Sequence, residues 1–269
     1  MFLLTGIIWV IFLSLKNAVI DSLLDHRSVR RFKDKVIEPE VLEMLLKSGL
    51  RAASAGNLQS YSLIVVDDRE KKEELSRACG GHQDFIADAA VNIAAVVDQF
   101  RFKKWVELNK GHFHADYAIT LFIGFWDAII ALHNIVVAAE SIGLGTCYVG
   151  NFLSVDIQSL FGTPDYVAPA GLVSIGYPDE EPELRPRLPL EAVVHRNSYR
   201  VYSDEEIRSL YRVMDDRWKS FSEEGRKRFV ESGVLNVAQY VTLMHYTEEF
   251  IRSESEKLLQ NIKKAKFKL

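Results

Sequence analysis

The chain has 269 residues, 48% of them hydrophobic and 26% charged, and a formal net charge of −4. This length and composition are typical of a globular protein with one large domain or two small ones. The negative charge argues against a nucleic-acid binder. Two cysteines without a CxxC pair exclude a disulfide framework and favour a reducing, cytoplasmic compartment. Because no histidine has a carboxylate or cysteine at ligand spacing, we expect no metal site.

Residues 2–15 form a nearly continuous apolar stretch. As a helix this stretch would span about 21 Å, which is short of the ~30 Å hydrocarbon core of a bilayer. It also lacks the basic flank and cleavage site of a secretory signal. Three interpretations remain: a start assigned too early, a membrane-surface anchor, or a helix packed on the body of the protein. We favour the first, and treat residues 1–16 as an extension whose contact with a membrane is the less favoured alternative.

A basic cluster, His26 to Arg31, follows an apolar helical turn. Its guanidinium groups and hydroxyl can ring a phosphate, but a basic cluster also suits the negative C-terminal end of a helix dipole. A second cluster, Arg185-Pro186-Arg187, lies in a proline-stiffened loop far downstream. The presence of two such clusters in one chain favours an anion site.

Helix and strand patterns alternate in the next hundred residues. Pro39 to Leu50 has the first-turn proline and apolar stripe of a helix. The small, polar loop Ala52 to Ser60 can approach a ligand closely. The sequence then predicts strands at 61–66 and 91–97, separated by a helix at 69–79 and a Gly80-Gly81 turn.

Residues 99–115 are aromatic and basic, and we expect an irregular excursion that can cover a site. Residues 116–142 are apolar on almost every face, which indicates a helix buried at a domain centre or a subunit interface, and Gly143 stands where the C-cap of this helix is expected. A tight, glycine-bounded segment at 145–150 and strands at 172–176 and 190–194 follow. Charged amphipathic helices come next, beginning with a capping box at Ser203. This order predicts an α+β, three-layer domain over residues 17–200 and a helical extension over 201–269.

No nucleophile elbow, Walker loop or GxGxxG fingerprint is present, and the GxG at Gly143 follows a helix rather than a strand. Hydrolase and kinase functions therefore have no support. An anion site with a small-residue loop suits a phosphate-bearing cofactor whose own ring carries the reaction. Accordingly we assign no side chain as a catalytic acid or base.

Five motifs occur in an order that resembles the nitroreductase superfamily, and specifically its oxygen-insensitive NADPH nitroreductase and flavin reductase branch. They are His26–Arg30, Ala53–Gln59, Gly80–Gln83, Ala138–Gly145, and Gly176–Pro178 continuing through Arg185–Pro189 to His195 and Tyr199. The resemblance covers about residues 17–200. It implies a mostly antiparallel sheet flanked by helices, in an intertwined homodimer with FMN at the subunit interface.

The resemblance also implies positions for the cofactor. The FMN phosphate would be held by His26, Arg27, Ser28, Arg30, Arg185 and Arg187. The ring would be lined by Ser54, Ala55 and Gly56, by Gln83, and by the segment Tyr148, Val149, Gly150 and Asn151. The usual serine run is partly replaced here by Ala55-Gly56, and the lysine usual at position 185 is an arginine. The reductant would be NADPH or NADH. Candidates for the basic loop that holds the NADPH 2′-phosphate are Arg217, Lys219, Arg226, Lys227 and Arg228, of which the dense run 226–228 is either that site or a surface helix.

The function that follows is an FMN-dependent NAD(P)H oxidoreductase, which transfers hydride by a ping-pong mechanism to a nitroaromatic, quinone or flavin acceptor. The alternatives are a membrane-tethered, flavin-binding electron-relay protein, suggested by residues 2–15, and an FMN reductive dehalogenase of the same fold. The expected partners are a small-molecule acceptor and a second copy of the chain, without nucleic acid.

Overall fold

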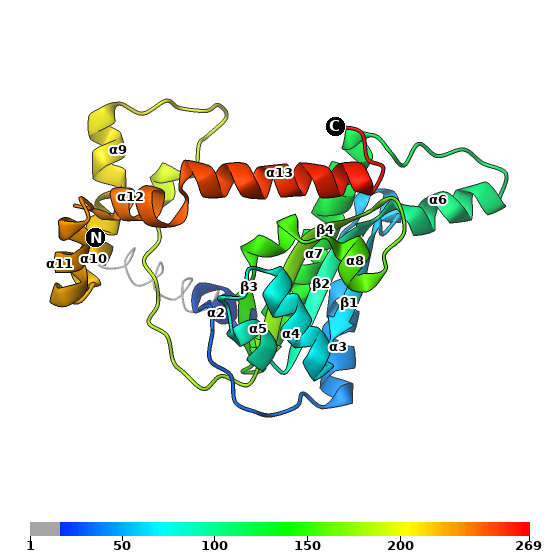
Figure 1. Ribbon diagram of the computed structural model, residues 1–269, viewed down its shortest axis with the longest axis horizontal. Helices are drawn as coiled ribbons and strands as arrows, with labels where there is room; N and C mark the ends of the chain where they lie inside the picture. Colours follow the sequence, from blue (N-terminus) through cyan, green and yellow to red (C-terminus); the bar gives the residue numbers. More distant parts are fainter. Residues whose placement is uncertain (1–16) are drawn as a thin grey trace, which may run out of the picture. The chain divides into compact units, whose positions relative to one another are not determined.

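The computed structural model describes residues 17–269, which form two compact units (Figure 1). The first unit holds the described residues up to Glu183 together with Ser255–Leu269, and the second is Leu184–Glu254. The expected division at residue 200 thus differs from the division in the structure. The last residues rejoin the first unit because they pack there: Asn261 Nδ2 donates to the Ser154 carbonyl at 2.8 Å, and Phe267 is buried. The apolar stretch 2–15 lies outside the described residues, so its interpretation stays a prediction.

A four-stranded antiparallel sheet forms the centre of the first unit. Its strands are β1 (Tyr61–Val66), β2 (Val91–Asp98), β3 (Gly145–Tyr148) and β4 (Val167–Gly176), in the order β1-β2-β4-β3. The two central strands, β2 and β4, are buried along their whole length, which explains their continuous apolar sequences. The α+β class and the antiparallel sheet flanked by helices are confirmed.

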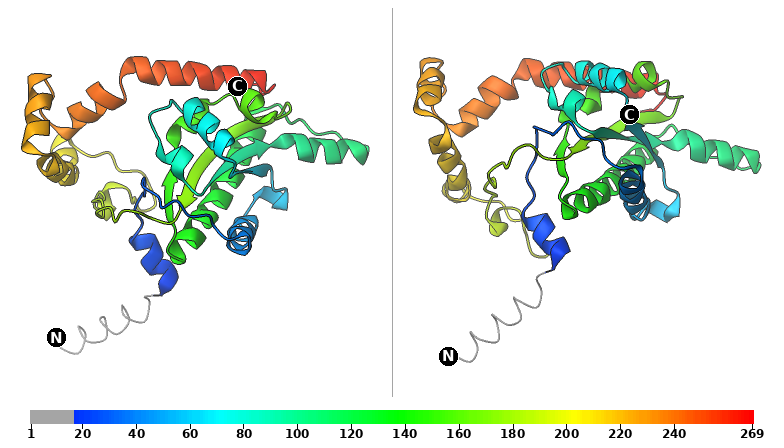
Figure 2. Two further views of the ribbon diagram at one scale, coloured as in Figure 1. Left: turned by 60° about the horizontal axis from the view of Figure 1, so that its bottom comes forward. Right: turned by 90° about the horizontal axis from the view of Figure 1, so that it is seen from below.

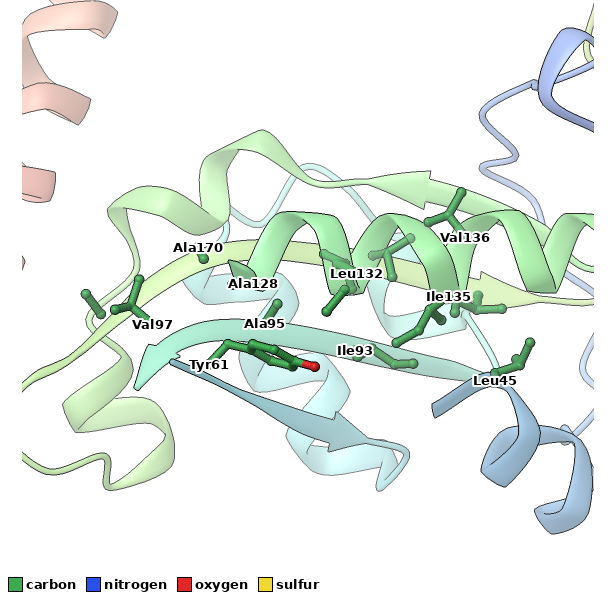
Figure 3. Close-up of a cluster of buried hydrophobic side chains, with 14 of the residues drawn as sticks. Leu45, Tyr61, Ile93, Ala95, Val97, Ala128, Leu132, Ile135, Val136 and Ala170 are labelled. Atoms are coloured by element: carbon green, nitrogen blue, oxygen red, sulfur yellow. The ribbon is translucent and has the colours of Figure 1, made fainter. Parts of the chain in front are cut away.

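Helices cover both faces of this sheet (Figure 2). On one face lie α3 (Pro39–Leu50) and α7 (Ala118–Ser141), and on the other lie α4 (Arg69–Ala78), α5 (Phe85–Asp88) and α8 (Ile157–Phe161). Strand β2 serves both layers, because Ile93 and Ala95 pack under α7 while Ala94 and Val96 face α4. Figure 3 shows the α7 layer, where Leu132 and Ile135 meet Ile93.

The other elements are shorter. In the first unit they are α2 (Ala18–Leu24), η1 (Ala55–Asn57), α6 (Gln99–Leu108) and η2 (Gly150–Ser154). In the second unit they are η3 (Leu190–Ala192), α9 (Asp204–Leu210), α10 (Arg212–Ser220), α11 (Glu223–Glu231), α12 (Val237–Tyr240) and the π-helical η4 (Val241–His245). Helix α13 (Glu248–Lys264) continues from the second unit into the first. Ring contacts among Phe221, Phe229 and Tyr240 form an aromatic cluster in the second unit.

The structure predicted for two segments was wrong. Residues 99–115 are not all irregular, because helix α6 starts directly after β2, where the Asp98 carboxylate caps it by accepting the Arg101 backbone N–H at 2.9 Å. Residues 190–194 form no strand but the short turn η3, and Leu190 and Val193 are exposed. The fourth strand of the sheet is β3, which lies in the segment expected only to be tight and bounded by glycines. A four-residue strand depends on its partner β4 for hydrogen bonds, so its own residues carry little signal.

Helix α7 ends in the way its sequence predicts. Gly143 has φ +85°, a left-handed conformation that favours glycine, and its N–H donates to the Glu140 carbonyl at 3.0 Å. The Leu144 N–H donates to the Ala139 carbonyl, also at 3.0 Å, which completes a Schellman motif. This sharp stop turns the chain directly into β3, and so positions the edge strand of the sheet.

Both cysteines are buried in the layer between the sheet and α4, and we expect them to be unreactive. Burial raises the pKa of the Cys79 thiol to about 12. At pH 8 the reactive thiolate is then on the order of one part in ten thousand. A chromogenic disulfide reagent should therefore find no thiol in the native protein between pH 7 and 9, and both thiols after unfolding. Rapid reaction of a thiol in the native protein would contradict this expectation.

Candidate functional site

The predicted phosphate segment, residues 26–30, runs along the outer edge of β3. Ser28 forms a parallel bridge with Thr146, and the Val29 N–H donates to the Thr146 carbonyl at 2.9 Å. The close approach needs a glycine at position 145, because a Cβ there would lie 2.8 Å from Val29. The segment is therefore held in place by the sheet itself.

His26 is oriented by a carboxylate from the end of α7. Its Nδ1 lies 2.9 Å from Glu140 Oε1, and Glu140 also accepts a hydrogen bond from the Thr146 hydroxyl. The Glu140 side chain is largely buried, and its carboxylate is paired there with the His26 ring and the Thr146 hydroxyl. This arrangement fixes the imidazole ring next to the bridge between Ser28 and Thr146.

Arg27 lies in a cavity of about 220 Å³ whose lining includes Glu140, Glu180 and Glu181. One terminal guanidinium nitrogen is 3.5 Å from Glu181, whose side chain is 91% exposed, so this ion pair is weak. The Arg27 Nε is buried and has no hydrogen-bond partner among the described residues. A buried, unpaired donor is costly, and an anionic acceptor in this cavity would satisfy it.

The next two residues bind an anionic oxygen through their backbone. Glu180 Oε1 accepts the N–H of Arg30 at 2.6 Å and that of Arg31 at 3.1 Å. Successive N–H groups that converge on one oxygen are the arrangement by which loops bind phosphate. Here Glu180 occupies both N–H donors, and the cavity lining also carries the carboxylates of Asp25, Glu140 and Glu181, so a phosphate-bearing group at this position would take the place of the Glu180 carboxylate beside the unpaired Arg27 Nε.

The second predicted segment, Tyr148 to Asn151, continues from β3 into η2. The Val149 N–H donates to the Leu172 carbonyl at 2.9 Å, and the Tyr148 ring stacks on His133 of α7. Packing around the phenol, and then the charge of Glu140, raise the pKa of Tyr148, so this hydroxyl stays neutral at physiological pH. The Asn151 amide lies beside the Gly80 turn, 3.6 Å from where a Gly80 Cβ would stand.

Gln83 follows the Gly80 turn, and its backbone carbonyl accepts a hydrogen bond from the Ser76 hydroxyl at 3.3 Å. The contact between the Gly80 turn and Asn151 places the two segments side by side. The structure thus brings three predicted segments, 26–30, 80–83 and 148–151, together around β3 and η2.

The loop with Ser54, Ala55 and Gly56 lies elsewhere, because it leads into β1 at the opposite edge of the sheet. Gly56 has φ +57°, a left-handed conformation that explains why glycine stands in the place of a serine. With strands about 4.8 Å apart, β1 and β3 are separated by roughly 14 Å. Within one chain this loop and the β3 edge are therefore not neighbours.

Asp127 of α7 anchors this loop, and sequence reasoning did not identify it. The carboxylate is 3% exposed and accepts the Ala55 N–H at 3.0 Å and the Ser60 N–H at 3.4 Å. The available signal was an acidic residue within an otherwise apolar helix. A carboxylate of this kind is buried only where N–H or O–H groups donate hydrogen bonds to it.

Arg185 and Arg187 belong to the second unit, where they line one cavity of about 450 Å³ with Arg217. Their predicted grouping with His26, Arg27, Ser28 and Arg30 stays a prediction. In the basic run 226–228, Arg226 donates to the Lys219 carbonyl at 3.1 Å, and Arg228 pairs with Glu224. These two contacts are those expected of the surface-helix alternative.

Comparison with known proteins relates the chain to flavin-dependent enzymes. The model of the Nitroreductase family matches residues 23–177. An FMN reductase (NADPH) of Bacillus subtilis is 34% identical over 193 residues, which cover 70% of this chain and 77% of that protein. The structure of B. megaterium NfrA2 superposes with a TM-score of 0.80 at 31% identity, covering 94% of this chain and 99% of that one. The structure of NADPH:FMN oxidoreductase from Vibrio harveyi, solved with NAD+, superposes with a TM-score of 0.70 at 32% identity. The match covers 80% of this chain and 92% of that one.

Proposed function

The chain belongs to the nitroreductase family, and from that membership we propose that it is an FMN-dependent NAD(P)H oxidoreductase. The observation that carries the proposal is the donor arrangement beside β3, where the Arg27 Nε has no partner among the described residues and two successive N–H groups converge on one oxygen, that of the Glu180 carboxylate. The matched relatives are named FMN reductase and NADPH:FMN oxidoreductase, which agrees with a phosphate-bearing flavin at this edge.

The FMN phosphate is assigned to His26, Arg27, Ser28 and Arg30. The ring is assigned to Ser54–Gly56, Gln83 and Tyr148–Asn151. When bound, FMN supplies the centre that takes a hydride from reduced nicotinamide and passes it to the acceptor, which is a nitroaromatic, a quinone or a flavin. The protein residues contribute position and electrostatics.

Each group of residues has a distinct part in this assignment. The bridge between Ser28 and Thr146 keeps the phosphate segment rigid, so little ordering is needed on binding. The Arg27 guanidinium offers a donor that is already desolvated. The neutral Tyr148 phenol, stacked on His133, gives an uncharged wall beside η2.

A homodimer is part of the proposal. The loop Ser54–Gly56 and the β3 edge lie at opposite edges of one sheet, so a second copy would supply the loop to the site of the first. Helix α7 supports this assembly because its face away from the sheet carries exposed apolar side chains, among them Phe122 and Trp126. By length and composition α7 could also cross a membrane, but Ala128, Leu132 and Ile135 pack fully buried on the sheet.

The visible spectrum of the purified protein tests the proposal. We expect a yellow protein with bound oxidised FMN, bleached by NADPH or NADH and reoxidised by a quinone, with parallel lines in double-reciprocal plots. Arg30→Ala should weaken FMN binding about 10- to 100-fold, since a hydrogen bond to a charged group is lost. Lys33→Ala, in the same exposed stretch, serves as the control. A colourless protein that does not bind added FMN would overturn the proposal.

A further inference from the structure

A cavity of about 620 Å³ lies between α6 and the face of the sheet that α8 covers. Ile64 of β1 and Val96 of β2 line it on the side of the sheet, and Phe161 and Pro164 line it where α8 ends. Cavities of this size, with mostly apolar walls and a few polar groups, are typical of small-molecule sites. None of the residues that line it is among those assigned to FMN, so the cavity is separate from the candidate flavin site.

One face of α6 contributes large apolar side chains to this cavity without burying them. Trp105 and Leu108 line it and are 60 and 73% exposed, and Phe100, which also lines it, is exposed as well. By contrast, Phe102 on the same helix packs edge-on against Phe113, with 4.7 Å between the ring centroids. Exposed apolar side chains that gather on one surface mark a binding site. The faces of the Phe100 and Trp105 rings suit a flat aromatic ligand in particular.

The charged residues that line the cavity leave one positive charge unbalanced. Asp98 and Arg101 compensate each other, since Arg101 Nε is 3.6 Å from Asp98 Oδ2. Arg101 is also held in place by donating to two backbone carbonyls, at 2.7 and 2.8 Å. The third charged residue, Lys104, has no hydrogen bond or ion pair among the described residues, because Glu107, one turn further along α6, pairs with Lys103 instead. A ligand with a single negative charge balances the ammonium group of Lys104.

We propose that this cavity is a binding site for an aromatic monocarboxylate. The ring of the ligand packs against Phe100 and Trp105, and its carboxylate pairs with the Lys104 ammonium group. A dianion finds no second unpaired cation in the lining, and an aliphatic carboxylate gains less from the flat aromatic walls. The inference goes beyond the proposed function and does not depend on it, because the cavity shares no residue with the candidate flavin site.

The test is calorimetric titration of the full-length protein with 2-naphthoate. Two comparison probes have nearly the same size: 2-naphthamide lacks the charge, and decahydro-2-naphthoate keeps the charge but lacks the flat ring. The variants are Lys104→Gln and Trp105→Ala, both at exposed positions, so the fold is expected to be kept. Lys110→Gln is the matched control, because it removes an exposed lysine just beyond α6 that does not line the cavity.

We expect 2-naphthoate to bind the wild type more tightly than either comparison probe. Lys104→Gln should weaken 2-naphthoate about 5- to 10-fold, because a partly exposed ion pair is lost, and should leave 2-naphthamide unchanged. Trp105→Ala should weaken both aromatic probes about 10-fold, because the ring that they stack on is removed.

Three results would overturn the inference. In the first, the wild type does not bind 2-naphthoate at millimolar concentration, as expected if a second copy of the chain covers the cavity. In the second, the amide or the saturated acid binds as tightly as 2-naphthoate. In the third, Lys104→Gln has no more effect than Lys110→Gln, or Trp105→Ala has none, which would place the bound probe elsewhere, for example beside the flavin. A wild type without bound flavin would overturn the proposed function but not this inference.

Discussion

Replacing Ile130 with glutamate is expected to break the homodimer and to release FMN. Ile119, Phe122, Trp126 and Ile130 are 64, 62, 70 and 38% exposed, and their spacing puts them on the face of α7 that turns away from the sheet. Adjacent large apolar side chains of this kind mark an interaction surface. A carboxylate buried at that surface without a partner costs several kcal/mol, which corresponds to a dimer dissociation constant raised by about 100-fold or more.

Sedimentation velocity at micromolar concentration, recorded at the protein and flavin wavelengths, measures both effects. We expect a yellow dimer for the wild type, and colourless monomer or aggregate for Ile130→Glu. Val36→Glu places the same charge at an exposed apolar residue before α3 and should leave the dimer intact. A variant that remains a yellow dimer, or a wild type that is a yellow monomer, would contradict the assignment of α7 to the subunit interface.

Asp127→Ala is expected to loosen the loop before β1 and so to reduce both stability and FMN affinity. The substitution removes the acceptor of the Ala55 and Ser60 N–H groups, and the Ser60 N–H is left buried. The loss of a buried, charge-assisted hydrogen bond costs about 1–3 kcal/mol. Asp127→Asn keeps one oxygen acceptor and should have a smaller effect.

Urea unfolding at fixed protein concentration measures the change in stability. FMN titration measures the change in FMN affinity that follows from loosening the loop. We expect the unfolding midpoint to fall in the order wild type, Asp127→Asn, Asp127→Ala. FMN affinity should fall in the same order, because Ser54–Gly56 no longer holds one conformation. Asp34→Ala, at an exposed loop carboxylate, is the control and should change neither quantity. Unchanged FMN affinity in Asp127→Ala would separate this loop from the flavin site.

Residues close together in the chain determined the ends of several helices and two of the strands. Pro39, the capping box at Ser203 and Gly143 set helix ends through hydrogen bonds within one or two turns, and all three stand where their sequence predicts. Strand β1 has its predicted bounds, because an apolar run between turn residues is also a local signal. The order of five motifs was enough to indicate the family.

Only the tertiary structure decided what depends on residues far apart in the chain. The four residues of β3 become a strand through hydrogen bonds with β4, and they then hold Ser28, more than a hundred positions earlier. The partners of Asp127, the N–H groups of Ala55 and Ser60, follow only from the packing of α7 against the loop before β1. The separation of that loop from the β3 edge, and the meeting of Arg217 with Arg185 and Arg187, follow from chain topology. Periodicity and capping report the neighbours of a residue along the chain, whereas side chains converge on a site through contacts between distant segments.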